Sequence, residues 1–110
     1  MSANFIKLDS PEKLENLFQE SHEKPVVLFK HSTTCPISAG VYEEVSKVSA
    51  DINLVVMQSA RNISSAIAEK TGIRHESPQA IILKDGEPIY HASHFDVTAK
   101  DIVNELASES

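Results

Sequence analysis

Two short runs of consecutive apolar residues constrain the fold more than any other feature of the sequence. They span residues 26–29 (VVLF) and 54–57 (LVVM). Each run is short for a helix and apolar at every position, which is typical of a strand buried on both faces of a sheet. Between them, Val41 and Val45 recur at helical spacing. A strand, a helix and a strand in this order predict a parallel pair joined by a right-handed crossover.

Helical segments are expected before, between and after these strands. A serine at residue 10 followed by a proline at residue 11 favours a helix start, because proline lacks only an amide that is unpaired in the first turn. That helix is expected to run to about His22, and the one after residue 36 to include Val48. A third helix opens at Arg61, and Gly72 stands where it would be capped. The last helix is expected to start near Thr98 and to bury Ile102, Val103 and Leu106.

The chain ends in a predicted hairpin and a helix, which completes the fold class. An apolar run at 80–83 and a second candidate strand at 88–92 flank Asp85-Gly86, a strong signal for a two-residue turn between antiparallel strands. The elements predict an α/β fold, a three-layer α/β/α sandwich with a mixed central sheet of four strands. Residues 5–7 are a candidate for a fifth strand at the N-terminus. At 110 residues the chain is expected to form one domain, 1–110.

Charge and composition argue against several classes of function. The net charge of −6 disfavours nucleic acid or an anionic membrane surface as the main partner. The longest apolar runs are about four residues, far short of the ~20 needed to span a bilayer. The first ten residues lack the basic and apolar regions of a secretory signal, so a cytoplasmic location is expected. The five histidines are scattered and no acidic cluster resembles a calcium loop, so no metal site is expected.

Cys35 is the only cysteine of the chain, and its position makes it the candidate for chemistry. It comes six residues after Phe29, beyond the end of the first central strand, where open parallel sheets bind ligands. Pro36 suits the first turn of the next helix, whose unpaired amides favour a thiolate. Lys30 and His31 are expected to add positive potential. The alternative is a small buried hydrophobe, and the polar residues before the cysteine argue against it.

Nearly the whole chain resembles the thioredoxin-like proteins. The shared features are the order of elements, a cysteine between strand and helix, and an Xaa-Pro before the hairpin. More narrowly, residues 34–38 (TCPIS) and 75–79 (HESPQ) resemble the monothiol bacilliredoxins. This resemblance implies an enzyme that removes bacillithiol from mixed disulfides on oxidised cytoplasmic proteins. Bacillithiol is then the co-substrate, no cofactor is tightly bound, and a low-molecular-weight thiol or a reductase regenerates the protein.

The residue three positions after the cysteine decides which cycle is expected. Dithiol oxidoreductases carry a resolving cysteine there, and this chain has Ser38. A serine can donate a hydrogen bond to the Cys35 thiolate but cannot form a second disulfide, so the expected cycle uses one thiol. The resemblance also places Phe29 where thioredoxins tend to carry a buried acid that assists the resolving thiol. Thr34 and Pro36 are expected to complete the active-site loop.

A second loop is expected to bind the small thiol. The resemblance places Pro78 at the cis-proline that faces the cysteine, whereas X–Pro bonds in general favour trans. The backbone of Ser77 would then pair with the peptide-like part of the thiol. The carboxylates of its malyl group need donors or cations, and the candidates are Lys30, His31, Arg61, His75 and Gln79. His91 and His94 lie in a stretch that also resembles the family, and a structural role is expected for them.

Three other functions are compatible with the same residues. A glutaredoxin-like enzyme would use glutathione or another small thiol, since C-P-x-S also occurs in glutaredoxin variants. A non-catalytic thioredoxin-like adaptor would carry a cysteine that the small thiol merely protects. A cysteine hydrolase would need His31 or His75 within hydrogen-bond reach of Cys35 and a third orienting residue, and the sequence supplies no such triad.

Overall fold

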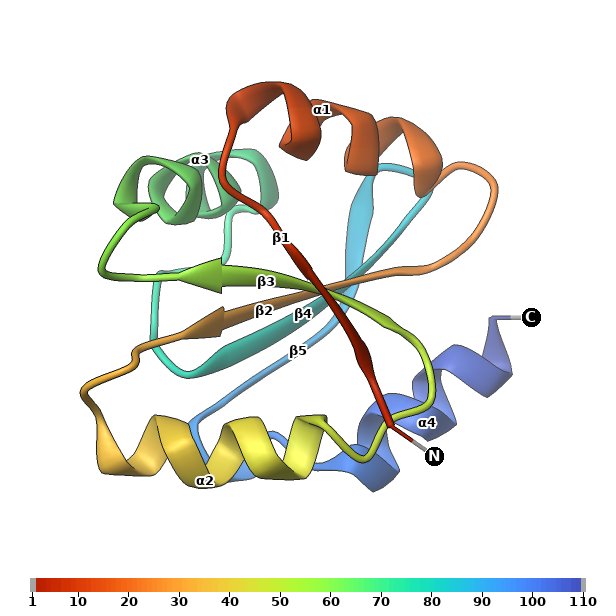
Figure 1. Cartoon of the computed structure of the whole chain (residues 1–110). Coiled ribbons are helices and arrows are strands. Elements are labelled where there is room, and N and C mark those ends of the chain that lie inside the picture. The colour runs from red at the N-terminus through yellow and green to blue at the C-terminus, as the bar shows by residue number, and fades with distance from the viewer. Residues whose placement is uncertain (1, 110) are drawn as a thin grey trace.

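The computed structural model describes residues 2–109, and a five-stranded mixed sheet forms its centre (Figure 1). The elements are β1 (Asn4–Lys7), α1 (Pro11–Glu20), β2 (Val26–His31), α2 (Pro36–Val45), β3 (Asp51–Val56), α3 (Arg61–Thr71), β4 (Gln79–Lys84), β5 (Glu87–Ser93), a 3-10 turn (His94–Asp96) and α4 (Ala99–Ser108). The strand order is β1-β3-β2-β4-β5. The first three of these are parallel, and β4 and β5 are antiparallel to their neighbours. The expected α/β sandwich is confirmed, and the candidate fifth strand is present as β1.

Element boundaries differ from the sequence expectation where pairing or packing extends a pattern. β2 continues past the apolar run to His31, because its last two residues still pair with β3. β3 begins at Asp51, three residues before the apolar run, since residues 51–54 pair with β1. α2 ends at Val45, so Val48 is buried beyond the helix. The prediction that Val103 is buried is wrong: it is 47% exposed, because Ile102 takes the inward position of this turn.

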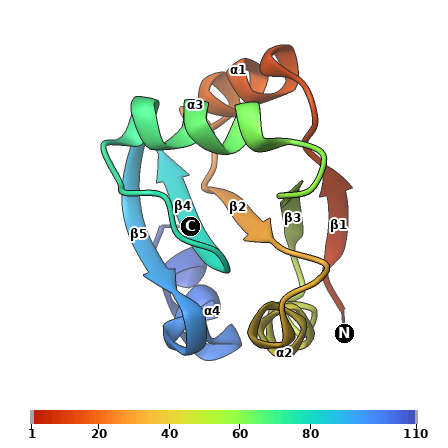
Figure 2. The same ribbon diagram turned by 90° about the vertical axis from the view of Figure 1, so that its left-hand side faces the viewer.

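Different helices cover the two faces of the sheet. α1 and α3 lie on one face, and α2 and α4 lie on the other (Figures 1 and 2). Val26 and Leu28 of β2 belong to the core on the α1 and α3 side, whereas Val27 and Phe29 belong to the core on the α2 and α4 side. The alternation continues to the end of β2, so the side chains of its last two residues, Lys30 and His31, enter different layers.

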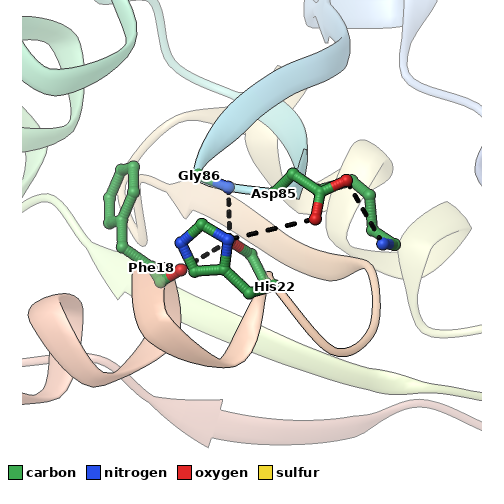
Figure 3. A network of polar contacts seen from close by, with 6 residues as sticks. Phe18, His22, Asp85 and Gly86 are labelled. Atoms are coloured by element: carbon green, nitrogen blue, oxygen red, sulfur yellow. Dashed lines mark hydrogen bonds and ion pairs between the residues drawn. The ribbon is translucent and has the colours of Figure 1, made fainter.

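A polar network joins the end of α1 to the β4–β5 turn (Figure 3). The fully buried Ser21 donates its hydroxyl to the Phe18 carbonyl at 2.6 Å and accepts the Gly86 amide at 2.8 Å. The Ser21 carbonyl also accepts the Asp85 amide at 2.7 Å, and His22 lies 3.9 Å from the Asp85 carboxylate. Both turn residues have positive φ, 55° and 76°, as the Asp-Gly pair predicts. The network therefore holds the hairpin against the first helix.

Candidate active site

Cys35 is the N-cap residue of α2, beyond the carboxyl end of β2. Its backbone is extended, with φ −97° and ψ 120°, and Pro36 begins the helix as expected. The side chain is half-buried and makes no capping hydrogen bond. The first amides of α2 therefore receive no hydrogen bond from the side chain of the N-cap residue. The sulfur thus lies at the amide-rich end of a ten-residue helix, in the setting that the sequence argument requires.

Ser38 is fully buried, and its hydroxyl contacts groups other than the sulfur. The oxygen accepts the Ser32 amide at 2.9 Å and lies 2.8 Å from His31 Nδ1. A hydroxyl has a single proton, so Ser38 can donate to a thiolate only while His31 Nδ1 carries a proton of its own. Donation from Ser38 to Cys35 stays a prediction, and the side chain has a second role in closing the loop before the cysteine.

His31 is a hydrogen-bonding partner of the site rather than a source of charge. Its ring lies 4.8 Å from the Tyr42 ring and 6.0 Å from the Phe29 ring, measured between centroids. This burial lowers the pKa of His31, against a smaller opposing contribution from its hydrogen bond with Ser38. The lowered pKa favours the neutral imidazole, which reduces the positive potential expected from this residue. Phe29 is fully buried. It occupies the position at which, by the resemblance, thioredoxins carry a buried acid.

Gln58 holds the loop before Cys35, although it is not among the residues predicted from the sequence. Its Oε1 accepts the Thr33 amide at 3.1 Å, and its Nε2 donates to the Ser32 hydroxyl at 2.9 Å and the Thr34 hydroxyl at 3.2 Å. Gln58 follows β3, the parallel neighbour of β2, and the carboxyl ends of parallel strands meet at one edge of the sheet. The rule that singled out Cys35 after the first central strand would have found Gln58 after the second.

We expect Gln58→Ala to slow disulfide exchange at Cys35 about fivefold while the protein stays folded. The variant removes three hydrogen bonds from an exposed loop, and a positioning loss of about 1 kcal/mol corresponds to that factor in rate. The measurement is the rate constant for reaction of Cys35 with a small aromatic disulfide. Gln19→Ala, on the exposed side of α1, is the matched control. Equal rates for the two variants would show that other contacts hold the loop.

The second loop has the expected cis peptide bond between Ser77 and Pro78. The Pro78 carbonyl accepts the His94 amide at 2.9 Å, which joins this loop to the turn after β5. His94 has a φ of 55° and begins the 3-10 turn, whereas His91 is exposed on β5. The hydroxyl of Ser77 is buried and has no hydrogen-bond partner within residues 2–109. The backbone of His94 thus joins the turn after β5 to this loop, and a structural role for the side chains of His91 and His94 stays a prediction.

Lys30 and His75 meet on the α1 and α3 side of the sheet. Lys30 Nζ lies 3.2 Å from His75 Nδ1, and the hydroxyl of Ser64 in α3 lies 2.8 Å from the same nitrogen. Lys30 is only 1% exposed, so it cannot contact a bound thiol directly, and burial lowers its pKa to about 8. His75 is exposed. Its partial desolvation, and then the charges of Lys30 and Arg61, lower its pKa.

The remaining candidates for thiol binding are divided between surface and interior. Arg61 is the exposed first residue of α3. Gln79 is buried and donates its Nε2 to the Arg74 carbonyl at 3.0 Å. It is also the cross-strand neighbour of Lys30, so these two side chains share one face. The structure thus leaves Arg61 and His75 accessible to a ligand and places Lys30 and Gln79 in the interior next to them.

Residues 2–109 form neither a hydrogen-bonded cysteine–histidine pair nor a cluster of metal-ligating side chains. Neither His31 nor His75 is hydrogen-bonded to Cys35 in residues 2–109, so the pair that a cysteine hydrolase needs is not formed in this structure. The described chain holds no group of three or more His, Cys, Asp or Glu side chains that could bind a metal ion. None of its helices is both long and apolar enough to cross a membrane.

Fold and site together define the class of the protein. A thioredoxin from Trypanosoma brucei brucei matches it with a TM-score of 0.75 and 14% identity, covering 96% of this chain and 89% of that one. A thioredoxin from Nicotiana alata matches with a TM-score of 0.72 and 12% identity over 99% and 95%. The chain is a thioredoxin-like protein with a single cysteine at the start of α2.

The family follows from two further comparisons. The family model described as monothiol bacilliredoxin BrxC matches residues 6–102. A protein described as a candidate oxidoreductase with a thioredoxin fold is 35% identical, with a TM-score of 0.80 and 91% of each chain covered. The chain belongs to the monothiol bacilliredoxin BrxC family.

Proposed function

We propose that this protein is a monothiol thiol–disulfide oxidoreductase that removes bacillithiol from mixed disulfides on oxidised cytoplasmic proteins. The observation that carries the proposal is the arrangement around its only thiol. Cys35 caps α2 without a side-chain hydrogen bond, and a buried serine occupies the position of a resolving cysteine. Membership of the bacilliredoxin family supports bacillithiol as the thiol.

The proposed reaction is two successive exchanges of one disulfide bond. The Cys35 thiolate attacks the bacillithiol sulfur of the modified client, the client–bacillithiol S–S bond breaks, and the client leaves as a thiolate that takes a proton from water. Cys35 is now joined to bacillithiol. The thiolate of a second bacillithiol attacks the bacillithiol sulfur, so Cys35 is released and the oxidising equivalents leave as bacillithiol disulfide. A separate reductase returns that disulfide to two thiols.

Binding of the small thiol is assigned to the loop around the cis-proline. The backbone of Ser77 would pair with the peptide-like part of bacillithiol by strand addition. The malyl carboxylates would meet His75 and Arg61, which are the accessible donors among the candidates. His31 lies in the other layer of the structure, on Ser38, and contributes by holding that hydroxyl.

The test compares two mixed disulfides on one client protein, one with bacillithiol and the other with glutathione. We expect faster release of the client thiol from the bacillithiol adduct, followed by appearance of an adduct on Cys35 in the mass spectrum. Faster turnover of the glutathione adduct would replace the proposal by the glutaredoxin-like alternative. No release from either adduct, with Cys35 alkylated by iodoacetamide at the rate of a free cysteine across the pH range, would favour the adaptor.

A further inference from the structure

We propose that Lys30 is a positioning residue, which fixes His75 as a neutral hydrogen-bond donor to a carboxylate of the bound thiol. The inference rests on the proposed function and adds to it a division of labour between a buried and an exposed side chain. Lys30 does not touch the ligand. Instead it determines which nitrogen of His75 carries the proton. The position of this proton decides whether the accessible edge of the ring is a hydrogen-bond donor or an acceptor.

Lys30 is a buried cation without an acidic partner. Within residues 2–109, the hydrogen-bond partner of its Nζ is His75 Nδ1, and no carboxylate lies within ion-pair distance. Lysines that form ion pairs in this structure do so with carboxylates that are at least one-third exposed. Burial of an unpaired ammonium is unfavourable, so an ionisable group in this position marks a functional-site candidate.

The contact with Lys30 decides the tautomer of His75. An ammonium group has only donors, so the ring nitrogen that faces it accepts and carries no proton. The Ser64 hydroxyl, 2.8 Å from the same Nδ1, is then a second donor that shares the single lone pair of this nitrogen with Lys30. The ring proton is therefore on Nε2, the nitrogen on the side of the ring away from Lys30. No group in residues 2–109 is hydrogen-bonded to Nε2, which leaves this N–H as a donor on an exposed side chain.

The charges around His75 favour an anion at that donor. Lys30 from β2 and Arg61 from α3 act on the ring with positive charge, and Glu76 is the neighbouring negative group. Interaction with Ser93, and then with His94 and Arg74, lowers the pKa of the Glu76 carboxyl, so this negative charge already has stabilising neighbours. A ligand carboxylate would receive the N–H of His75 within the field of two cations. His75 also precedes Ser77 in one loop, so a single segment carries both contacts.

The test uses Lys30→Met, which removes the ammonium and keeps a long apolar stem, with Lys84→Met as the matched control. Long-range proton–nitrogen NMR spectra report the tautomer of His75. We expect the Nε2–H form in the unmodified protein and in Lys84→Met. In Lys30→Met we expect the ring proton on Nδ1, donating to Ser64, and a raised pKa of His75. The Nδ1–H form in the unmodified protein would overturn the proposal.

Two ligand measurements then separate positioning from a structural effect. Titration with L-malate, followed at the His75 ring nitrogens, is expected to give about tenfold weaker binding in Lys30→Met, the effect of losing one charge-assisted hydrogen bond. KM for a bacillithiolated client is expected to rise by a similar factor, with kcat unchanged. KM for the same client carrying 2-mercaptoethanol, which has no carboxylate, is expected to stay constant.

The outcomes distinguish this inference from the proposed function. Equal losses on both adducts, or unchanged malate binding, would overturn the role of Lys30 while leaving the exchange reaction in place. A protein inactive on both adducts would end the proposed function, and the tautomer and malate titration would still decide the role of Lys30. Should Lys30→Met not fold, two variants of His75 are compared by calorimetric titration with L-malate. His75→Gln keeps a donor at the surface and His75→Phe removes it, so their affinities are expected to differ about tenfold.

Discussion

Cys35→Ser is expected to reduce removal of a small thiol from a mixed disulfide to the uncatalysed background. The chain has no other sulfhydryl group that could attack a disulfide, and a hydroxyl does not replace a thiolate in this exchange. The free energy of unfolding should change by no more than about 0.5 kcal/mol, because the side chain is half-buried and caps nothing. The measurements are client thiol release over time and denaturant unfolding of both proteins.

Ser38→Ala is the companion variant, because it keeps the thiol and removes the adjacent hydroxyl. It is expected to retain exchange at a reduced rate. Equal release of client thiol in the presence of Cys35→Ser and of the unmodified protein would show that release does not depend on the cysteine, as expected for a non-catalytic adaptor. The pair thus separates a missing nucleophile from a disturbed loop.

Ser38→Cys is expected to convert the site into a dithiol centre that forms an internal disulfide under mild oxidation. The introduced sulfur would replace an oxygen that lies 2.8 Å from His31 Nδ1, and the ring is neutral because burial lowers the pKa of His31. A neutral imidazole can accept the proton of the new thiol. The resemblance implies that a buried acid takes up this proton in thioredoxins, where this chain has Phe29. His31 would replace that acid as the proton acceptor. The new thiolate could then attack Cys35 and release bacillithiol without a second thiol molecule.

The comparison that isolates this role is Ser38→Cys alone against Ser38→Cys combined with His31→Phe. The phenyl ring keeps the contacts with Tyr42 and removes the base, so closure of the disulfide is expected to slow about a hundredfold, the usual scale of general-base catalysis. Equal closure rates would assign the proton to solvent. No disulfide in either variant would mean that residue 38 does not reach the sulfur of Cys35.

Local patterns were sufficient to predict most of the fold. Ser10 and Thr98 cap their helices through the amides of Lys13 and Asp101, and Gly72 ends α3 with a φ of 75°. These signals act within a few residues, so they can be read without knowledge of tertiary structure. The burial of Val103 could not be predicted in this way. Its neighbour Ile102 fills the inward position of the turn, and tertiary packing alone determines which of the two residues is buried.

The candidate site could be predicted only in part, for a related reason. Cys35 with Pro36 is a local signal, and it led to the correct place in the fold. Burial of Lys30 follows from strand alternation with Leu28, yet its partner His75 is 45 residues away and depends on the loop before the cis-proline. Gln58 reaches the active-site loop from a neighbouring strand, 24 to 26 residues later in the chain. Such contacts depend on tertiary geometry and leave no periodicity in the sequence.

The double attachment of the loop before Cys35 has a consequence for the choice of client. Gln58 binds residues 32–34, and the hydroxyl of Ser38 accepts the amide of residue 32. These contacts restrict the backbone that precedes Cys35, so the loop has less freedom to adapt to a rigid partner. Conformational adjustment in the encounter therefore falls to the client. We therefore expect adducts on mobile termini and locally unfolded segments to exchange faster than adducts on rigid surfaces.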